Sequence, residues 1–390
     1  MRILISGASI AGPACALLLS RQGHDVTVVE RAPRLRPGGQ TVDLRGAGRT
    51  VIERMGLADS VAEQLLDQRG LAYVDDAGRH RAVMPVEAFG GHGIVSSHEI
   101  LRGDLAKVLY DATTSSVSYV WDDTVTAIED GRVSFEKRRT ETFDLIIGAD
   151  GLHSAVRKAA FLDVDVRPIG IQTTWFTAAV DQSIDGWFLM HNQPGGLVAT
   201  VRPSHNPAEV KAGLSVRTNV EIDRRNPEAQ WQFFEERFAE SGWLIPQLLR
   251  EMRTAPDYAF DSLAQVRMQS WTTGRVALVG DAGYCPTALT GLGTTLALVG
   301  AYVLAGELDR HDVETALGNY DAIMRPFVTD AQNLPPMGTR GFAPGTRFEI
   351  ALGRASIRAM NRWPMRSLFA AEFAKAGAID LPDYEIALAN

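Results

Sequence analysis

The feature that most constrains the fold is an apolar strand that runs directly into closely spaced glycines at the start of the chain. Residues 2–6 are apolar and β-rich, and the turn that follows reads Gly7-Ala8-Ser9-Ile10-Ala11-Gly12. A helical pattern over 13–21 and a second strand over 26–30 complete a β-α-β unit. The first glycine allows the sharp turn, and the third lets helix and strand approach closely. We therefore expect a Rossmann-like parallel sheet.

The same turn predicts a nucleotide site. The helix that it opens offers free N–H groups to a pyrophosphate. Glu30 ends the second strand, where an acid accepts hydrogen bonds from an adenosine ribose. Ser9 replaces the usual second glycine, and its small side chain is tolerable there. The candidate cofactor residues of this region are Gly7, Ser9, Ile10, Ala11, Gly12 and Glu30. The turn alone does not distinguish NAD from FAD.

A second segment far along the chain favours FAD. A short buried-strand pattern closes on Gly280-Asp281, and a strand-terminal carboxylate suits the ribityl chain of a flavin, which NAD lacks. Gly291-Leu292-Gly293 then leads into an apolar helix over 294–308. Its N-terminal N–H groups and dipole suit the negative charge of a reduced flavin, so Gly291, Gly293 and Thr294 are further candidates.

The pattern between these segments predicts an α/β protein with a discontinuous Rossmann-like domain. A buried strand ends at Asp150-Gly151, and longer alternating segments follow from about residue 166 to 270. We expect residues 1–70, 101–165 and 272–330 to form a FAD-binding domain. Residues 71–100 and 166–271 are expected to form an inserted antiparallel-sheet substrate domain, and residues 331–390 a C-terminal helical segment that covers the pocket or bridges the domains.

Composition excludes several classes of protein. The 390 residues are 45% hydrophobic and 22% charged, as in ordinary globular proteins, and a net charge of −8 without a basic stripe argues against nucleic-acid binding. The longest apolar run is too short for a bilayer and no leader is evident, so we expect a cytoplasmic protein with no membrane partner. Two cysteines and scattered histidines predict neither disulfides nor a metal site.

Taken in order, these motifs resemble the class A FAD-dependent monooxygenases, which have the fold of para-hydroxybenzoate hydroxylase. The resemblance covers about residues 2 to 330. It is carried by the glycine turn with Glu30-Arg31, Arg102 at the start of a helix, Asp150-Gly151 and Gly280-Asp281. Two blocks, 38–44 and 99–105, look most like the tetracycline-inactivating monooxygenases and their actinobacterial relatives.

The resemblance implies roles for individual residues. Glu30 and Arg31 would hold the adenosine end of FAD, Arg102 and Asp150 would lie near the pyrophosphate, and Asp281 would bind the ribityl or phosphate region. Asp43 would contact FAD near its ring end, and Arg36 would contact NADPH or NADH, because a guanidinium can clamp a phosphate. Relatives usually carry histidine, proline and asparagine at the positions of Tyr284, Ala288 and Thr295, where this chain departs.

Several of these residues also have a purely structural interpretation when taken singly. Arg36 and Arg102 suit surface ion pairs, Asp150-Gly151 suits a turn, and Asp281 suits a helix cap. Cys285 is expected to be a small packed residue without a redox role, since nothing in the sequence would activate its thiolate.

The implied chemistry is oxygen insertion. NAD(P)H would reduce FAD, O2 would add to form the flavin C4a-hydroperoxide, and one oxygen atom would pass to an aromatic or polycyclic small molecule. The flavin carries this chemistry, so no catalytic side chain is predicted. Candidate substrate contacts on the inserted sheet are Trp175, Met190 and His191, which are otherwise core or exposed residues.

Two other functions stay open. A flavin-dependent dehydrogenase or reductase would share every FAD motif, and so would a non-catalytic protein that sequesters FAD or a small molecule. The sequence does not choose between hydroxylation and Baeyer–Villiger insertion, and a monomer or weak dimer is expected.

Overall fold

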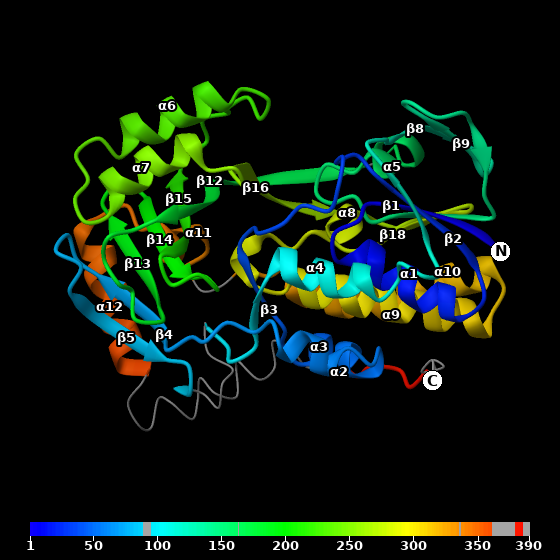
Figure 1. Cartoon of the computed structure of the whole chain (residues 1–390), viewed down its shortest axis with the longest axis horizontal. Coiled ribbons are helices and arrows are strands. Elements are labelled where there is room, and N and C mark those ends of the chain that lie inside the picture. The colour runs from blue at the N-terminus through cyan, green and yellow to red at the C-terminus, as the bar shows by residue number, and fades with distance from the viewer. Residues whose placement is uncertain (89–94, 163, 335–336, 361–378, 385–390) are drawn as a thin grey trace.

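The computed structural model describes residues 1–88, 95–162, 164–334, 337–360 and 379–384. Its elements form two halves that lie side by side, one around a six-stranded sheet and one around a seven-stranded sheet (Figure 1). The architecture is α/β, as the sequence predicts. Each half draws on segments from several parts of the chain, so the backbone crosses between the halves repeatedly.

The six-stranded sheet has the order β17-β18-β11-β1-β2-β7, and every neighbouring pair except β17–β18 is parallel. Its central strands are apolar runs buried on both faces, which is typical of parallel sheets covered by helices. The strands are β1 (Arg2–Ser6), β2 (Asp25–Glu30), β7 (Ser118–Trp121), β11 (Leu145–Gly148), β17 (Thr272–Thr273) and β18 (Val276–Leu278).

Helices cover this sheet. Helix α1 packs against α9, which also packs against α10 and α2 (Figure 1). The expected helix over 294–308 is present as α9, and α2 and α3 form a pair of short helices on either side of Gly56. The helices of this half are α1 (Ala11–Arg21), α2 (Ala47–Arg54), α3 (Ala58–Ala62), α4 (Arg102–Asp111), α5 (Ala155–Ala160), α8 (Asp281–Tyr284), the 3-10 turn η2 (Ala288–Thr290), α9 (Gly293–Arg310) and α10 (Val313–Ala331).

Two small sheets complete this half. One, of three antiparallel strands, comprises β8 (Val125–Glu129), β9 (Arg132–Phe135) and β10 (Glu141–Thr142). The other pairs β3 (Thr41–Asp43) with β6 (Glu99–Leu101) in antiparallel register, which sets Asp43 opposite Glu99. This pairing brings together two blocks that are distant in sequence.

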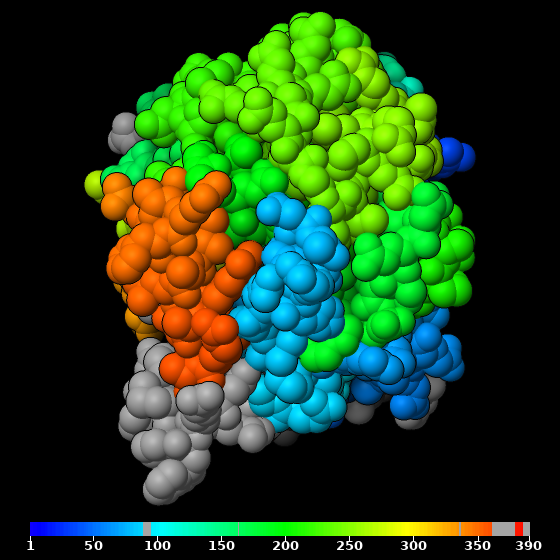
Figure 2. Space-filling model, turned by 90° about the vertical axis from the view of Figure 1, so that its left-hand side faces the viewer, coloured from blue at the N-terminus to red at the C-terminus, as the bar shows by residue number. Residues whose placement is uncertain are grey.

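The seven-stranded sheet has the order β16-β12-β15-β14-β13-β4-β5. Helices α6 (Pro227–Arg237) and α7 (Ile245–Thr254) pack on one face, and α11 (Thr339–Phe342) and α12 (Arg347–Met360) contribute to the core on the other face. Figure 2 shows α12 beside β5 on the outer surface. The strands are β4 (Gly70–Val74), β5 (His80–Pro85), β12 (Asp165–Ala179), β13 (Trp187–Gln193), β14 (Leu197–Pro203), β15 (Glu209–Arg217) and β16 (Ala259–Arg267).

This sheet differs from the expected one in detail. Strand β4 pairs with β13 in parallel. The chain between these two strands passes through the other half of the molecule, whereas a hairpin would have made them antiparallel. The remaining pairs are antiparallel. Helices α6 and α7 interrupt the alternating segment expected over residues 166–270, and residues 89–94 of the expected sheet segment 71–100 lie outside the described residues.

Of the C-terminal helical segment that the sequence predicts over residues 331–390, the described residues form α11 and α12, and α12 ends at Met360. Residues 361–378 and 385–390 lie outside the described part of the chain, and residues 379–384 are not helical. Pro382 lacks a backbone N–H, and its carbonyl accepts hydrogen bonds from Arg54 (2.9 Å) and from Tyr302 (3.2 Å). The segment therefore binds across the helices of the first half instead of forming a turn of its own.

One glycine lets a buried aromatic side chain reach helix α9. A Cβ on Gly300 would lie 2.0 Å from the hydroxyl oxygen of Tyr284, which is fully buried. That hydroxyl also lies 2.9 Å from the hydroxyl of Tyr320, whose own O–H donates to the carbonyl of Leu278. The contact joins α8, α9 and α10 to the parallel sheet.

We therefore expect Gly300→Ala to lower the free energy of unfolding by about 1–3 kcal/mol, the usual effect of overpacking a dense core. Urea unfolding followed by far-UV circular dichroism measures it. Gly318→Ala is the matched control, because Gly318 is exposed in α10 with open space around its Cα. It should raise stability by roughly 0.5–1 kcal/mol through helix propensity. Equal effects of the two changes would contradict the packing argument.

Candidate functional site

The carboxyl ends of four parallel strands meet at one edge of the six-stranded sheet. In the observed register Ser6 lies beside Val29 and Gly148, and Gly148 lies beside Leu278. The residues that follow these strands are therefore neighbours, although they come from the beginning, middle and late parts of the chain. They include Gly7, Glu30, Asp150 and Asp281 of the predicted set. In open α/β sheets, ligands bind at this edge.

The glycine turn is as tight as the motif requires. Gly7 has a φ of 108°, and a Cβ there would lie 2.4 Å from the carbonyl oxygen of Ala149. A Cβ on Gly12 would lie 1.8 Å from the carbonyl oxygen of Gly7. Ile10 stands just before α1 and Ala11 is its first residue, with no side-chain cap at this end. The first N–H groups of α1 thus remain available at the edge of the sheet.

Glu30 is almost fully buried and binds the turn. One carboxylate oxygen accepts a hydrogen bond from the N–H of Ala8, and the other from the N–H of Ala32, both at 2.9 Å. Each oxygen can accept a further bond, so the carboxylate can both fix the turn and meet a ribose hydroxyl. The neighbouring Arg31 is exposed.

Arg102 contacts the glycine turn at residues 7–12. Its Nη1 donates to the hydroxyl oxygen of Ser9 at 3.1 Å, and a Cβ on Gly39 would lie 2.7 Å from its Nε. Burial and the nearby Arg36 lower the pKa of Arg102 to about 10, which leaves it charged at neutral pH. Arg36 itself is exposed, and a small pocket touches Ser9, Glu30, Arg36 and Arg102. Ser9, which replaces the second glycine of the motif, is therefore hydrogen-bonded to Arg102.

The two carboxylate oxygens of Asp150 have different surroundings. Oδ2 accepts from the N–H groups of Ala155 (2.7 Å) and Val156 (3.2 Å) in the first turn of helix α5, whose N-cap is Ser154. Oδ1 is buried and has no hydrogen-bond partner. Gly151, with a φ of 78°, turns the chain here. An unpaired buried carboxylate oxygen is costly, so Oδ1 fits a site that a ligand hydroxyl would complete.

Asp281 faces the start of helix α9. A Cβ on Gly293 would lie 3.7 Å from its Oδ1, and Gly291, with a φ of 66°, has open space around it. The side chain is exposed, yet surrounding protein raises the pKa of its carboxyl, so it lines a hollow rather than an outer surface. Thr294 is partly buried in the first turn of α9. These residues and Asp150 form a cradle that fits FAD.

Buried Arg157 connects two parts of this cradle and was not predicted. Its Nη1 donates to the carbonyl of Ala282 at 2.6 Å, and its Nη2 to the carbonyl of Leu152 at 2.5 Å. It thereby ties the loop after β11 to helix α8. In sequence it looks like any helical arginine, so only its burial reveals the role.

The remaining predicted cofactor residue, Asp43, is already paired. It forms an ion pair with Arg45 at 2.6 Å and accepts a hydrogen bond from Ser96 at 2.8 Å. Its carboxylate therefore fixes the C-terminal end of β3, the strand that follows the loop at residues 39–41.

Two of the departures from the family pattern point into the core. Tyr284 packs against α9 and Tyr320, and Thr295 is fully buried beside α2, whereas Ala288 lines the cavity described below. Burial and the nearby Asp281 raise the pKa of the Cys285 thiol well above its usual value. Cys285 therefore stays protonated, which agrees with a packed residue.

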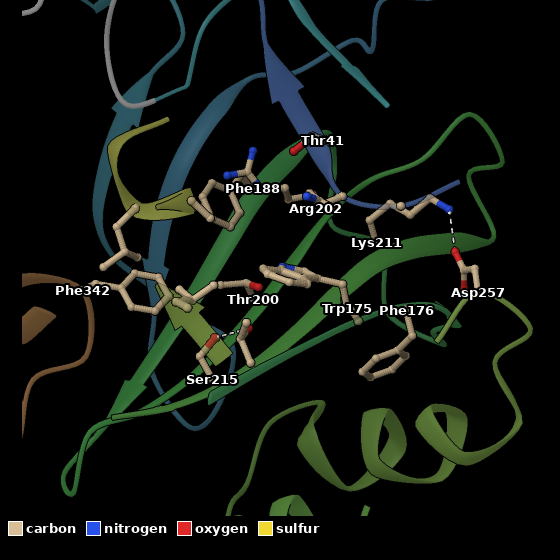
Figure 3. A pocket seen from close by; sticks show the side chains of 17 residues that line it. Thr41, Trp175, Phe176, Phe188, Thr200, Arg202, Lys211, Ser215, Asp257 and Phe342 are labelled. Atoms are coloured by element: carbon tan, nitrogen blue, oxygen red, sulfur yellow. Dashed lines mark hydrogen bonds and ion pairs between the residues drawn. The ribbon is translucent and has the colours of Figure 1, made fainter. Parts of the chain in front are cut away.

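A cavity of about 160 Å³ lies between the loop at residues 39–41 and the seven-stranded sheet (Figure 3). Trp175, Phe188, Leu289 and Phe342 give it apolar and aromatic walls. Its polar members are hydroxyls, the amide of Gln40, the carboxylate of Asp257 and two cations, of which Lys211 pairs with Asp257 at 3.4 Å. Aromatic walls with a few polar groups between them fit a ring compound.

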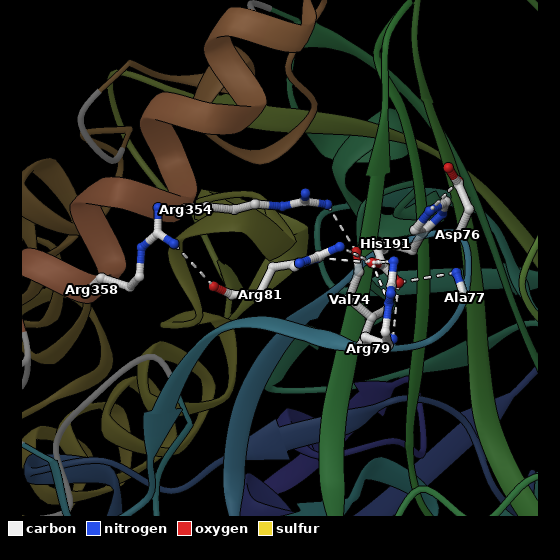
Figure 4. A network of polar contacts seen from close by, with 9 residues as sticks. Val74, Asp76, Ala77, Arg79, Arg81, His191, Arg354 and Arg358 are labelled. Atoms are coloured by element: carbon white, nitrogen blue, oxygen red, sulfur yellow. Dashed lines mark hydrogen bonds and ion pairs between the residues drawn. The ribbon is translucent and has the colours of Figure 1, made fainter.

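Of the three predicted substrate contacts, Trp175 lines this cavity and the other two lie elsewhere. Met190 packs with Leu71 and Ile357 in the core under α12. His191 lies on the opposite face of β13, because successive strand residues alternate between faces. Its Nε2 is 3.0 Å from Asp76 (Figure 4), and burial lowers its pKa. The structure thus gives His191 no route to the cavity.

The cavity residues that sequence reasoning missed include Arg202, Lys211 and Phe342. For the first two a signal was present, because Thr200 and Arg202 on β14 and Lys211 and Ser215 on β15 are polar residues at even spacing in otherwise buried strands. Phe342 comes from α11, far along the chain, and no sequence pattern linked it to the sheet. Nowhere in the described part of the chain do three or more histidine, cysteine or acidic side chains gather to hold a metal ion.

Comparison with known proteins agrees with this geometry. A family model described as an FAD binding domain matches residues 1–332. An uncharacterized protein of Mycobacterium tuberculosis is 42% identical over 353 residues, covering 88% of this chain and 94% of that protein. An FAD-dependent monooxygenase of Sarocladium schorii is 36% identical over 370 residues, covering 87% of each chain.

Among solved structures, the tetracycline destructase Tet(51) superposes with a TM-score of 0.83 at 32% identity, covering 98% of this chain and 99% of that one. Within the described residues, no helix is long and apolar enough to cross a membrane. The matched model spans the glycine turn, the Asp150 loop and the Asp281 segment together. The chain is therefore a member of the FAD-binding family of flavin-dependent monooxygenases.

Proposed function

We propose that this protein uses NAD(P)H and O2 to insert one oxygen atom into an aromatic or polycyclic small molecule. The observation that carries the proposal is an aromatic cavity whose lining includes Gly39, which lies against Arg102, the partner of Ser9 in the glycine turn. Ala288 and Leu289, which shortly precede Gly291, line it as well. Such a reaction needs a site for FAD and a neighbouring pocket for a ring compound, and this chain would provide both.

In this proposal FAD lies along the carboxyl edge of the parallel sheet. Its adenosine end would meet Glu30 and Arg31, and its pyrophosphate would meet the start of α1 with Arg102. Its ribityl chain would meet Asp281, and the unpartnered Oδ1 of Asp150 supports the presence of a further hydroxyl nearby. The flavin ring would then reach the loop at residues 39–41 and the start of α9, near Gly291, Gly293 and Thr294.

FAD, when bound, would supply the electron transfer and the activation of O2. The protein's own part is to orient the substrate and to exclude water, which would otherwise divert the reaction. Trp175, Phe188 and Phe342 provide that apolar enclosure. No side chain has to act as nucleophile, and the nearby Asp257 and Lys211 are already paired with each other.

The similarity to the tetracycline destructase Tet(51) supports a polycyclic substrate. The aromatic walls of the cavity would stack on such rings, and the hydroxyls of Thr200 and Ser215 would meet ring substituents. A flavin-dependent dehydrogenase, or a protein that sequesters FAD or the ring compound, would use the same residues but release no oxygenated product.

The direct test is mass spectrometry of products from polyketides, tetracyclines and simple phenols, incubated with the purified protein, NAD(P)H and air. We expect at least one compound to gain the mass of one oxygen atom and to stimulate NAD(P)H oxidation. The label should come from ¹⁸O2 and not from labelled water. NAD(P)H oxidation without an oxygenated product would favour the dehydrogenase, and no oxidation at all would favour sequestration.

Asp281→Ala should lower the affinity for FAD by about tenfold or more, because the change removes a charged hydrogen-bond acceptor from the cradle. The ratio of flavin to protein absorbance after gel filtration measures it. Asp309→Ala is the control, since Asp309 is an exposed acid at the far end of α9. Full FAD retention in the Asp281 variant would contradict the assignment.

Arg36→Ala should raise the KM for NADPH by about tenfold while FAD stays bound, because a guanidinium–phosphate contact is lost. Steady-state NADPH oxidation with a stimulating substrate gives this number. Arg132→Ala, an exposed change on β9, should leave the KM unaltered. If FAD content falls instead, Arg36 belongs to the FAD site and not to an NAD(P)H site.

A further inference from the structure

One cation in the wall of the cavity has unused hydrogen-bond donors. Arg202 lies on β14, its side chain is 25% exposed, and its guanidinium lies over the ring of Phe188 at 3.6 Å from the centroid (Figure 3). Its Nη1 donates to both oxygens of Glu99, at 2.9 and 2.8 Å. Among the described residues, Nε and Nη2 of Arg202 have no acceptor.

Glu99 is the acceptor that positions the guanidinium of Arg202. It lies on β6, is 1% exposed, and also accepts a hydrogen bond from Gln68. The stack on Phe188 fixes the plane of the guanidinium, and the two bonds to Glu99 fix its rotation. A planar donor group that is fixed on one side and free on the other is suited to bind a further anionic oxygen.

The other cation of the cavity is differently arranged. Lys211 lies directly across from Arg202 in the register of β14 and β15. It is only 11% exposed and donates to Thr177 at 2.6 Å and to Asp257 at 3.4 Å. The bonds from Thr177 and the charge of Lys211 lower the pKa of Asp257, so this acid stays ionised and neutralises its lysine. Both cations have an acidic partner, but Arg202 is the more exposed of the two and keeps two nitrogen donors for a ligand.

We propose that Arg202 determines substrate specificity by binding an anionic oxygen of the ring compound, with Glu99 and Phe188 as its positioning residues. The inference rests on the proposed function, since it takes the cavity as the substrate pocket. A deprotonated hydroxyl or an acidic substituent on a flat ring would lie against Arg202, while the ring lies among the aromatic walls. A neutral isostere would lose the charge-assisted bond.

The protonation state of Glu99 should change the strength of the contact between Arg202 and an anionic ligand. Burial, opposed by Arg202 and reinforced by Asp43, raises the pKa of Glu99 to about 7. Asp43 is in turn paired with Arg45, and Lys211 is the other charge facing Arg202. Below that pKa Glu99 is neutral and the charge of Arg202 is free for a ligand. Above it the carboxylate competes for the guanidinium, so affinity for an anion should fall as the pH rises through about 7.

The experiment measures binding by titration calorimetry to the FAD-loaded protein, without NAD(P)H. The probes are 2-naphthalenesulfonate, an anion at every pH used, and 2-naphthalenesulfonamide, its neutral isostere. At pH 6 we expect the sulfonate to bind about tenfold more tightly, the usual effect of one charge-assisted bond. The preference should shrink several-fold by pH 8.5.

The variants separate the charge from its positioning. Arg202→Gln should abolish the preference for the sulfonate, and Arg202→Lys should retain part of it. Glu99→Gln should keep the preference but make it independent of pH. Because each single change disturbs a buried pair, Glu99→Gln/Arg202→Gln serves as a second test that leaves no buried charge behind and should lack both preference and pH dependence. Arg167→Gln, an exposed change on β12, is the matched control.

Equal binding of the two probes by the unaltered protein, no binding of the sulfonate, or a preference that persists in Arg202→Gln would each overturn the inference. A pH dependence that survives in Glu99→Gln would remove Glu99 from it. These outcomes are independent of turnover. A protein that prefers the sulfonate yet oxygenates nothing would retain the anion contact and lose the proposed function.

Discussion

The parallel hydrogen bonding of β18, β11, β1 and β2 is the constraint on which the rest of the structure depends. Parallel strands in register end at the same edge, so four loops from the beginning, middle and late parts of the chain must meet there. Without that register Glu30 would not reach the glycine turn, and Asp150 would not lie near Asp281. The buried apolar runs that form the sheet therefore also position every polar group of the cradle.

The sequence predicts this edge well because its signals are local. The glycines at 7 and 12 need particular backbone geometry, and the acids at 30, 150 and 281 directly follow recognisable buried strands. The α/β class and the existence of a second sheet follow from the same patterns, whereas the parallel pairing of β4 with β13 has no local signature. That pair depends on a crossover, which only the complete fold determines.

The substrate side was harder to predict, and the reason is geometric. Met190 and His191 were both expected at the cavity, although adjacent residues of a strand point to opposite faces. The decisive contacts there join residues that are far apart, such as Glu99 with Arg202 and Gly39 with Arg102. Their partners cannot be read from spacing, because each contact depends on how the two halves pack together.

The repeated passage of the backbone between the halves has an evolutionary consequence. Neither half is a continuous stretch of chain, and the segment at 379–384 returns to bind Arg54 and Tyr302 after α12 has packed on the far sheet. Neither half could therefore be exchanged with that of a relative as one uninterrupted segment of chain. A substitution on the cavity face of a strand, by contrast, alters the lining and leaves the inherited scaffold whole.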